Sequence, residues 1–375
     1  MHGRKREPKE LKHDKARIQA RQRKAKLYAE LSSEVMKRRR EKRFDEESLT
    51  LAAKLLEMNC ELYSLWNYRK EFLDPILKRD GDAAEGKELA QQELKLIQTA
   101  LQKNPKSYCT WQHRKWIVAH KHLVDLEDEL RLCDLLLTVD DRNFHCWSYR
   151  RYVVKLMDRD PEKELDFTTE KILQNFSNYS AWHYRSALLP VVHKTIRFED
   201  LLEQSSSSKP KPAGEPKPKG PADDVPVWVL EEEFQWVKEA FYTEPEDQSA
   251  WLYHRWLTSH MLRDGKRGAS SPVAQDPSSS PPPPESSPVV QFLDGEVQMC
   301  REILEVEPGS KWPMLTLARL LHLRAEHGDG IAARENQALL EEGKTILRTL
   351  MGSDEMRKGY YGDAVSKGGG GVVPV

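Results

Sequence analysis

The chain has 375 residues, of which 32% are charged, with a formal net charge of −1 and a mean hydropathy of −0.73. No apolar run approaches the roughly 18 residues that a membrane-spanning helix needs, so we expect no stable membrane insertion. The five cysteines form no C-x-x-C pair and no dense disulfide pattern. This usage excludes a disulfide-stapled secreted domain and favours a cytoplasmic protein.

Residues 1–44 are predicted to form a basic helix or arm. Residues 1–43 hold 17 Lys or Arg and 6 Asp or Glu, a net charge of 17 − 6 = +11. Such an arm can bind nucleic acid or an acidic membrane, but Tyr28 is the only aromatic residue among these charges. We therefore favour a solvated helix that docks on the acidic remainder of the chain or on a protein partner, and we expect no nucleic acid.

Residues 45–202 hold four copies of one phrase, which predicts helical-hairpin repeats 1 to 4. The copies read LYSLWNYR, SYCTWQHR, NFHCWSYR and NYSAWHYR. An amphipathic stretch such as QELKLIQTALQKN precedes the tryptophan and ends in a polar joint. Residues that favour helix N-caps then stand four positions before the tryptophan, as Ser107, Asn143 and Asn178 do.

The rest of the chain continues this pattern with interruptions. Residues 203–226 and 263–290 together hold 13 of the 22 prolines and are predicted to be disordered linkers. A fifth repeat is predicted over 227–262, a terminal helical repeat over 291–350, and a flexible tail over 351–375.

These elements predict an all-α protein, an α-α superhelix or solenoid of tandem helical hairpins with two disordered insertions. The tryptophan and the arginine three positions later share one helix face. In the fifth copy Arg255 stands four positions after Trp251, and the sixth copy is irregular. We assign the tryptophans of all copies to the repeat structure: Trp66, Trp111, Trp147, Trp182, Trp251 and Trp312.

A candidate site lies where the second helices of hairpins 2 and 3 begin. The first turn of a helix offers free N–H groups that favour anions, and Lys106 and Arg142 stand beside two such turns. Tyr108 and His145 lie on the same first turns, and the His145 imidazole can donate to a phosphate. No nucleotide-binding, nucleophile or metal-ligand motif accompanies them.

The pattern [YF]-x-x-W-x-[YH]-R in tandem hairpins resembles the repeat of the protein prenyltransferase α-subunit family. The phrases NPKSYCTW, RNFHCWSYRR and NFSNYSAWHYR are most similar to the branch of that family that acts on Rab GTPases, the type II geranylgeranyltransferases. The resemblance covers residues of roughly 45–325 outside the two insertions.

The resemblance implies a heterodimer in which this chain wraps around a β subunit that carries Zn²⁺, so that the chain alone binds no cofactor and no metal. The complex would transfer geranylgeranyl from geranylgeranyl diphosphate to C-terminal cysteines of Rab GTPases presented by a Rab escort protein. The family pattern carries catalytic roles over to Lys106, Tyr108 and His145. It implies a rim toward the diphosphate or the β subunit, formed by Arg142, Asn143, Arg114 and Arg150.

Two alternatives stay open at this point. The chain could be a tetratricopeptide-like adaptor without enzymatic role, although the small residues typical of that repeat are replaced by the Trp–Arg phrase. It could also be the α subunit that the farnesyl and type I geranylgeranyl enzymes share, which serves a different substrate class.

Overall fold

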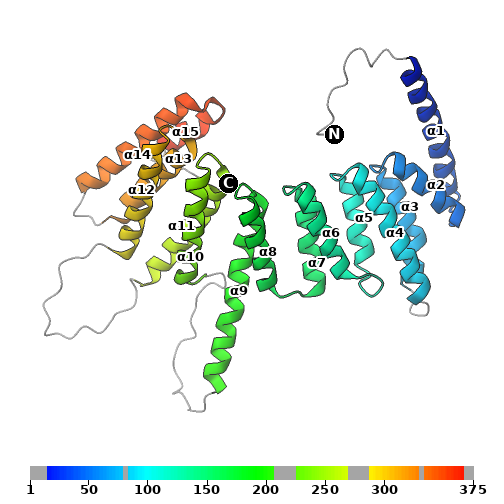
Figure 1. The fold of residues 1–375 in the computed structure, drawn as a ribbon, viewed down its shortest axis with the longest axis horizontal. Helices are drawn as coiled ribbons and strands as arrows, with labels where there is room; N and C mark the ends of the chain where they lie inside the picture. The colour runs from blue at the N-terminus through cyan, green and yellow to red at the C-terminus, as the bar shows by residue number, and fades with distance from the viewer. Residues whose placement is uncertain (1–14, 79–82, 207–224, 269–286, 329–332, 367–375) are drawn as a thin grey trace. The chain divides into compact units, whose positions relative to one another are not determined.

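The computed structural model describes residues 15–78, 83–206, 225–268, 287–328 and 333–366, and these residues contain helices but no β-strand. The chain divides into two compact units, Met1–Arg159 and Asp160–Val375. The predicted all-α fold of tandem helical hairpins is confirmed (Figure 1).

The first unit contains a leading helix and three hairpins. Its helices are α1 (Lys15–Arg40), α2 (Glu46–Met58), α3 (Tyr63–Leu77), α4 (Ala83–Lys103), α5 (Tyr108–Val118), α6 (Leu126–Val139) and α7 (Phe144–Met157). The second helices of the hairpins pack on one another, α3 on α5 and α5 on α7.

The second unit contains three further hairpins and a helical end. Its helices are α8 (Pro161–Gln174), α9 (Tyr179–Ser206), α10 (Val227–Thr243), α11 (Gln248–Gly268), α12 (Pro288–Val306), α13 (Lys311–His327), α14 (Ala333–Ser353), the 3₁₀ turn η3 (Glu355–Arg357) and α15 (Lys358–Ser366). Here too the second helices pack in series, α9 on α11 and α11 on α13.

The repeated tryptophan closes the joint inside each hairpin. Its ring is buried, and its indole Nε1–H donates to the backbone carbonyl six residues earlier at 2.8–2.9 Å. A buried indole N–H needs such an acceptor. The same bond gives a backbone carbonyl of the joint a hydrogen-bond donor. Five tryptophans are buried and bonded in this way: Trp66, Trp111, Trp147, Trp182 and Trp251.

The predicted N-caps are also confirmed. Ser107 Oγ accepts from Thr110 N at 3.2 Å, and Asn143 Oδ1 accepts from two backbone N–H groups at 3.1 and 3.3 Å. Asn178 and Asp247 cap α9 and α11 in the same way. These bonds fix the residue at which each second helix begins, and hence the angular position of every later side chain.

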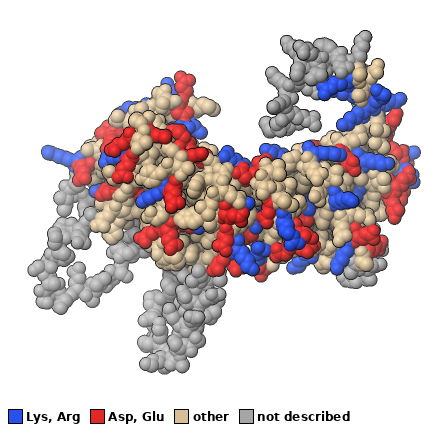
Figure 2. Space-filling view, viewed as in Figure 1, with Lys and Arg blue, Asp and Glu red and all other residues tan. Residues whose placement is uncertain are grey.

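Helix α1 carries the described part of the predicted basic arm. Most of its side chains are exposed, and Figure 2 shows Lys and Arg gathered over it. Near its end Arg38 is buried and donates to Glu34 Oε1 at 2.7 Å and to Glu47 Oε2 of α2 at 2.8 Å. Residues 1–14 of the arm lie outside the described residues.

Helices extend into both predicted linkers. Helix α9 continues to Ser206, α11 continues to Gly268, and α12 begins at Pro288. Proline is well tolerated in the first turn of a helix. The Pro-rich composition therefore led to a predicted linker that is too long at the start of α12. Within these two predicted linkers, residues 207–224 and 269–286 lie outside the described residues.

The register predicted for the sixth copy is wrong. Helix α13 is preceded by Ser310 as its N-cap, so the residue four positions after the cap is Met314, and Trp312 stands two positions too early. Trp312 is half-buried, and Lys311 Nζ and Arg357 Cζ lie 5.1 and 5.7 Å from its ring centroid. Met314 packs on the local core.

The flexible tail predicted over 351–375 is wrong for its first part. Residues 358–366 form α15, in which Tyr361 and Ala364 are buried against Leu347 and Leu350 of α14. The Tyr361 hydroxyl donates to Asp354 Oδ2 at 3.0 Å. Apolar residues at helical spacing outweigh the polar composition here. Residues 367–375 lie outside the described residues.

Candidate functional site

A buried glutamate in the middle of the first helix of a hairpin links that hairpin to the preceding one. Glu129 of α6 is 4% exposed and accepts from Arg114 Nε and Nη2 of α5, both at 2.7 Å. The hydroxyl of Tyr149, on α7 of the same hairpin, donates to Glu129 Oε2 at 2.5 Å. The arginine and the tyrosine of the repeated phrase therefore serve two different hairpins.

The same arrangement recurs elsewhere. Glu233 of α10 accepts from Arg185 Nε and from the Tyr253 hydroxyl, both at 2.7 Å. Glu93 of α4 accepts from Arg69 Nε at 2.9 Å and from His113 Nε2 at 2.6 Å. Buried charges are costly unless they are paired and hydrogen-bonded, and this repeated pairing holds neighbouring hairpins in register.

The fifth copy departs from the predicted alignment. His254, three positions after Trp251, takes the place of the arginine and bonds Glu296 Oε2 of α12 at 2.8 Å. Arg255, which the sequence suggested for this role, lies on a different part of the helix surface and lines a groove described below. Neighbouring side chains on a helix point about 100° apart, so one can lie in the core while the next lies at the surface.

Arg114 and Arg150 do not lie on a rim. Both are 3% exposed, and Arg150 Nη1 donates to Asp134 Oδ1 of α6 at 2.6 Å. Because their guanidinium groups are held inside the first unit, the prediction that they face a diphosphate or a β subunit is wrong. They position the helices that carry the surface residues.

The buried His113 predicts a pH dependence of stability. Burial lowers the pKa of His113 below its ordinary 6.5, against the opposing effect of Glu93. Below pH 6.5 the unfolded chain binds a proton that the folded chain resists, so stability falls as the pH falls from 7 to 5, by up to about 1.4 kcal/mol for each pH unit. Tyrosine fills this register in copies 1, 3, 4 and 5, and His113→Tyr should give a shallower dependence of the unfolding free energy on pH in urea unfolding.

The reciprocal variant Tyr149→His serves as the control for this pH prediction, and its slope between pH 7 and 5 should steepen. Equal slopes for the wild type and His113→Tyr would contradict the assignment. Glu93 acts in a lower window: although burial opposes it, Arg69 and His113 hold the pKa of Glu93 at about 2, so its contribution is lost as the pH falls below about 4.5.

An exposed row of aromatic rings marks the starts of the second helices in the first unit. The residue directly after each N-cap is Tyr63 in α3, Tyr108 in α5 and Phe144 in α7, with exposed fractions of 63%, 68% and 53%. The ring centroids of Tyr108 and Phe144 are 6.0 Å apart. Exposed large apolar side chains that gather in one row are typical of a protein interface.

A row of cations lies one to two turns further along the same helices. Lys70, Lys115 and Arg151 each stand four positions after the tryptophan of their copy. Lys115 Nζ donates to Ser148 Oγ of α7 at 3.1 Å, and Lys70 Nζ lies 5.5 Å from the Trp116 ring centroid. Burial lowers the pKa of Lys115, and the charge of Arg151 lowers it further. This row was not predicted, although its fixed offset of four positions from each tryptophan is present in the sequence.

Lys106 and Arg142 lie at the surface, as the sequence predicts. Lys106 Nζ lies 3.3 Å from Asp140 Oδ2, with 57% of its side chain exposed, so the ion pair is open to solvent. Arg142 is exposed in the equivalent joint of the next hairpin. The two cations flank the starts of α5 and α7, where free backbone N–H groups favour an anion.

His145 lies directly beside this surface. Its ring is 6% exposed, and the Tyr108 ring packs edge-on against it with centroids 4.3 Å apart. Burial and then the charge of Lys115 lower the pKa of His145, so its imidazole is neutral at pH 7. Its Nε2 atom is buried and has no hydrogen-bonding partner among the described residues.

Asn143 has a structural role in this chain. It caps α7, and its Nδ2 donates to the Pro105 carbonyl at 3.3 Å, in the joint of the preceding hairpin. Asn143 is 3% exposed. It therefore aligns the starts of α5 and α7 and does not itself offer a free polar group to a surface ligand.

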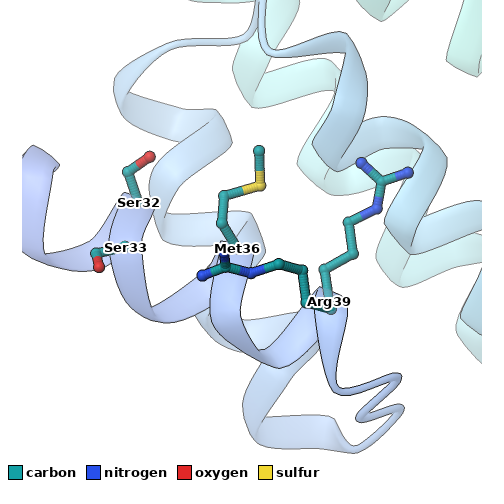
Figure 3. A pocket seen from close by; sticks show the side chains of 5 residues that line it. Ser32, Ser33, Met36 and Arg39 are labelled. Carbon is teal, nitrogen blue, oxygen red and sulfur yellow. The ribbon is translucent and has the colours of Figure 1, made fainter.

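A separate hollow of about 500 Å³ lies along α1 (Figure 3). Ser32, Ser33, Met36, Arg39 and Arg40 line it. Arg39 Nη2 donates to Glu71 Oε1 of α3 at 3.2 Å. The lining residues belong to one helix and bring no set of converging polar groups, so the hollow is a gap beside α1 and not the candidate site.

Two further observations concern the described residues as a whole. They contain no group of three or more His, Cys, Asp or Glu side chains that could hold a metal ion. Among them no helix is long and apolar enough to cross a membrane. The candidate site thus combines the cations Lys106 and Arg142 and two helix starts with nearby exposed aromatic rings.

The protein prenyltransferase alpha subunit repeat matches residues 45–74, 90–121, 126–157, 161–190 and 230–261. These segments coincide with the five hairpins from α2–α3 to α10–α11. The fold and the repeated Trp, Arg and Glu positions thus define the class of protein prenyltransferase α subunits.

Relatives narrow this class. The "Geranylgeranyl transferase type-2 subunit alpha" of Dictyostelium discoideum is 33% identical over 330 residues, which cover 88% of this chain and 87% of that protein. The protein of the same name from Candida albicans is 29% identical over 380 residues. The chain belongs to the family of geranylgeranyl transferase type-2 α subunits.

The relationship to the mammalian relatives covers less of their length. The rat protein of the same name is 39% identical over 257 residues, which span 68% of this chain and 41% of the rat protein. Among solved structures, a chain of "Candida albicans protein geranylgeranyltransferase-I complexed with GGPP" has a TM-score of 0.58 and 19% identity, covering 92% of this chain and 91% of that chain. This likeness supports the fold alone.

Proposed function

We propose that this chain is the α subunit of a heterodimeric protein geranylgeranyltransferase. The complex transfers geranylgeranyl from geranylgeranyl diphosphate to C-terminal cysteines of Rab GTPases, which a Rab escort protein presents in the cytoplasm. The relative from Dictyostelium, named for this type-2 enzyme and matched over 87% of its length, is the observation that carries the proposal.

The exposed aromatic row supports a partner subunit. Tyr63, Tyr108 and Phe144 expose more than half of their surface in the isolated chain, and aromatic residues are enriched at the cores of protein interfaces. We place the β subunit on this row. We also assign the zinc of the enzyme to the β subunit. There it would bind the sulfur of the acceptor cysteine and keep it as a thiolate.

The residues of this chain act on the departing diphosphate. As the bond between the isoprenoid carbon and the diphosphate oxygen breaks, negative charge grows on the leaving group. A cation placed in advance stabilises that charge most in the transition state. Lys106, held near Asp140 at the start of α5, provides such a cation, and Arg142 and the first turns of α5 and α7 add to the positive potential.

His145 and Tyr108 add hydrogen-bonding groups at the same place. His145 is neutral, and its backbone hydrogen bond to Lys106 uses the ring proton, so the buried Nε2 can accept a hydrogen bond from a donor group of the partner. Tyr108 packs on the His145 ring and holds its orientation. A neutral phenol next to a diphosphate can donate a hydrogen bond to it.

Co-expression with a candidate β subunit tests the proposal. The two chains should purify in equal amounts, and native mass spectrometry should find one bound zinc per heterodimer. The complex should modify a Rab protein when an escort protein is present and should ignore a short CaaX peptide. A monomeric chain would favour the adaptor alternative, and efficient transfer to the CaaX peptide would favour the farnesyl or type I enzymes.

A further inference from the structure

A groove of about 470 Å³ in the second unit has an unusual lining. It lies between α9 and α11, with aromatic rings such as Tyr179 and Trp256 on its walls. Arg255, Arg263, His183 and His260 also line it, and no Asp or Glu does. The groove therefore combines positive charge with apolar ring faces.

The rings and cations of the groove hold one another in place. The Trp256 ring stacks on Tyr253 with centroids 5.6 Å apart and lies 4.1 Å from the His260 ring. His260 Nδ1 bonds the Trp256 carbonyl at 3.0 Å, so Nδ1 carries the proton and Nε2 accepts from Arg263 Nη2 at 2.6 Å. Arg263 Nε also donates to the Ser259 carbonyl at 3.3 Å. The guanidinium is therefore already held in position, and its Nη1 group can serve a ligand.

Behind the groove lies an arginine without an acidic partner. Arg319 of α13 is half-buried and donates from Nη2 to Ser259 Oγ, a lining residue, at 3.3 Å. It forms no ion pair with any described carboxylate. Burial and then the charge of Arg255 lower the pKa of Arg319 to about 10. By contrast, the buried Arg69, Arg114 and Arg185 each bond a glutamate.

We propose that this groove, together with Arg319, receives acidic side chains of the β subunit and anchors the second unit in the heterodimer. The argument is charge complementarity: two neighbouring arginines, one of them half-buried without a carboxylate, are a poor arrangement for an isolated chain and a good one for a partner that brings carboxylates. Aromatic walls of this kind also suit a protein surface. The inference rests on the proposed function, because it needs the β subunit.

The test is the variant Arg319→Met in the full chain. Removing a charge that burial and Arg255 disfavour should leave the thermal midpoint of the isolated chain unchanged or raise it. The Kd for the β subunit, measured by surface-based binding or native mass spectrometry, should increase about 30-fold, as expected when one partner of a desolvated charge pair is lost. The salt dependence of the Kd between 50 and 500 mM, concentrations that screen open ion pairs, should also become weaker.

Two further variants make the outcome decisive. Arg301→Met removes an arginine of the same unit that already pairs with Glu342 at 3.0 Å, and its Kd should equal that of the wild type. Arg263→Gln changes an exposed lining residue and covers the case that Arg319→Met fails to fold. If the wild type binds the β subunit and all variants bind equally well, the groove inference is wrong. If the wild type itself does not bind, the proposed function is wrong.

Discussion

Glu129→Ala is expected to destabilise the first unit by about 3–5 kcal/mol. The substitution leaves the Arg114 guanidinium, 3% exposed, without its carboxylate, and it removes the acceptor of the Tyr149 hydroxyl. A buried charge that loses its partner cannot be rehydrated without opening the packing between α5 and α6. Urea unfolding of the full chain, followed by tryptophan fluorescence, measures the loss.

Glu127→Ala is the matched control on the same helix. Glu127 bonds Arg159 at 3.2 Å, but 53% of its side chain is exposed, so its loss should cost less than about 1 kcal/mol. Replacing the whole group with apolar residues, in the triple variant Arg114→Met, Glu129→Leu and Tyr149→Phe, should restore most of the stability. Similar losses for Glu127→Ala and Glu129→Ala would show that burial of the pair is not what matters.

The repeat could be predicted from sequence because two local signals agree. The N-cap residues Ser107, Asn143 and Asn178 each stand four positions before a repeated tryptophan. The structure places each of these caps at the start of its helix. Each signal has its own local cause, the indole bond to the joint and the capping bond. Where the tryptophan was followed without the cap, as at Trp312, the predicted register failed.

The glutamates were missed because a glutamate in a helix is ordinarily read as a solvated residue. Their spacing nevertheless identifies them: Glu93, Glu129, Glu164 and Glu233 each stand 18 positions before the tryptophan of their hairpin, as in 147 − 129 = 18. Glu296 stands 18 positions before Met314, which supports the corrected register of the sixth copy. Eighteen positions cross two helices and a joint, so no local pattern suggests the contact.

The candidate site was predicted in part. Sequence placed Lys106, Tyr108 and Arg142 at exposed helix starts, and the structure brings Tyr108 against His145. The sequence alone could not distinguish these exposed residues from the buried Arg114 and Arg150, because an arginine in a repeat has the same sequence pattern whether it is buried or exposed. The difference depends on where the facing glutamate lies, which is a tertiary contact.

Lys106→Ala should slow geranylgeranyl transfer by about 100-fold while the heterodimer still assembles. The expected size is that of losing one preorganised charge contact to a developing anion in the transition state. The substitution should not disturb the fold, because 57% of the Lys106 side chain is exposed and its ion pair with Asp140 is open to solvent. Single-turnover transfer with saturating geranylgeranyl diphosphate measures the chemical step directly.

Two variants separate a catalytic Lys106 from a structural one. Lys103→Ala removes an exposed lysine three residues earlier, one that donates to the Glu57 carbonyl, and its rate should match the wild type. Asp140→Asn removes the ion pair but keeps the lysine.

If Lys106 only stabilises the joint through Asp140, both Asp140→Asn and Lys106→Ala should slow transfer to the same extent. If Lys106 acts on the diphosphate, Asp140→Asn should transfer at the wild-type rate or faster, because the cation is then no longer shared with a carboxylate. An unchanged single-turnover rate for Lys106→Ala would remove this residue from the site and leave the anion-binding role to Arg142 and the two helix starts.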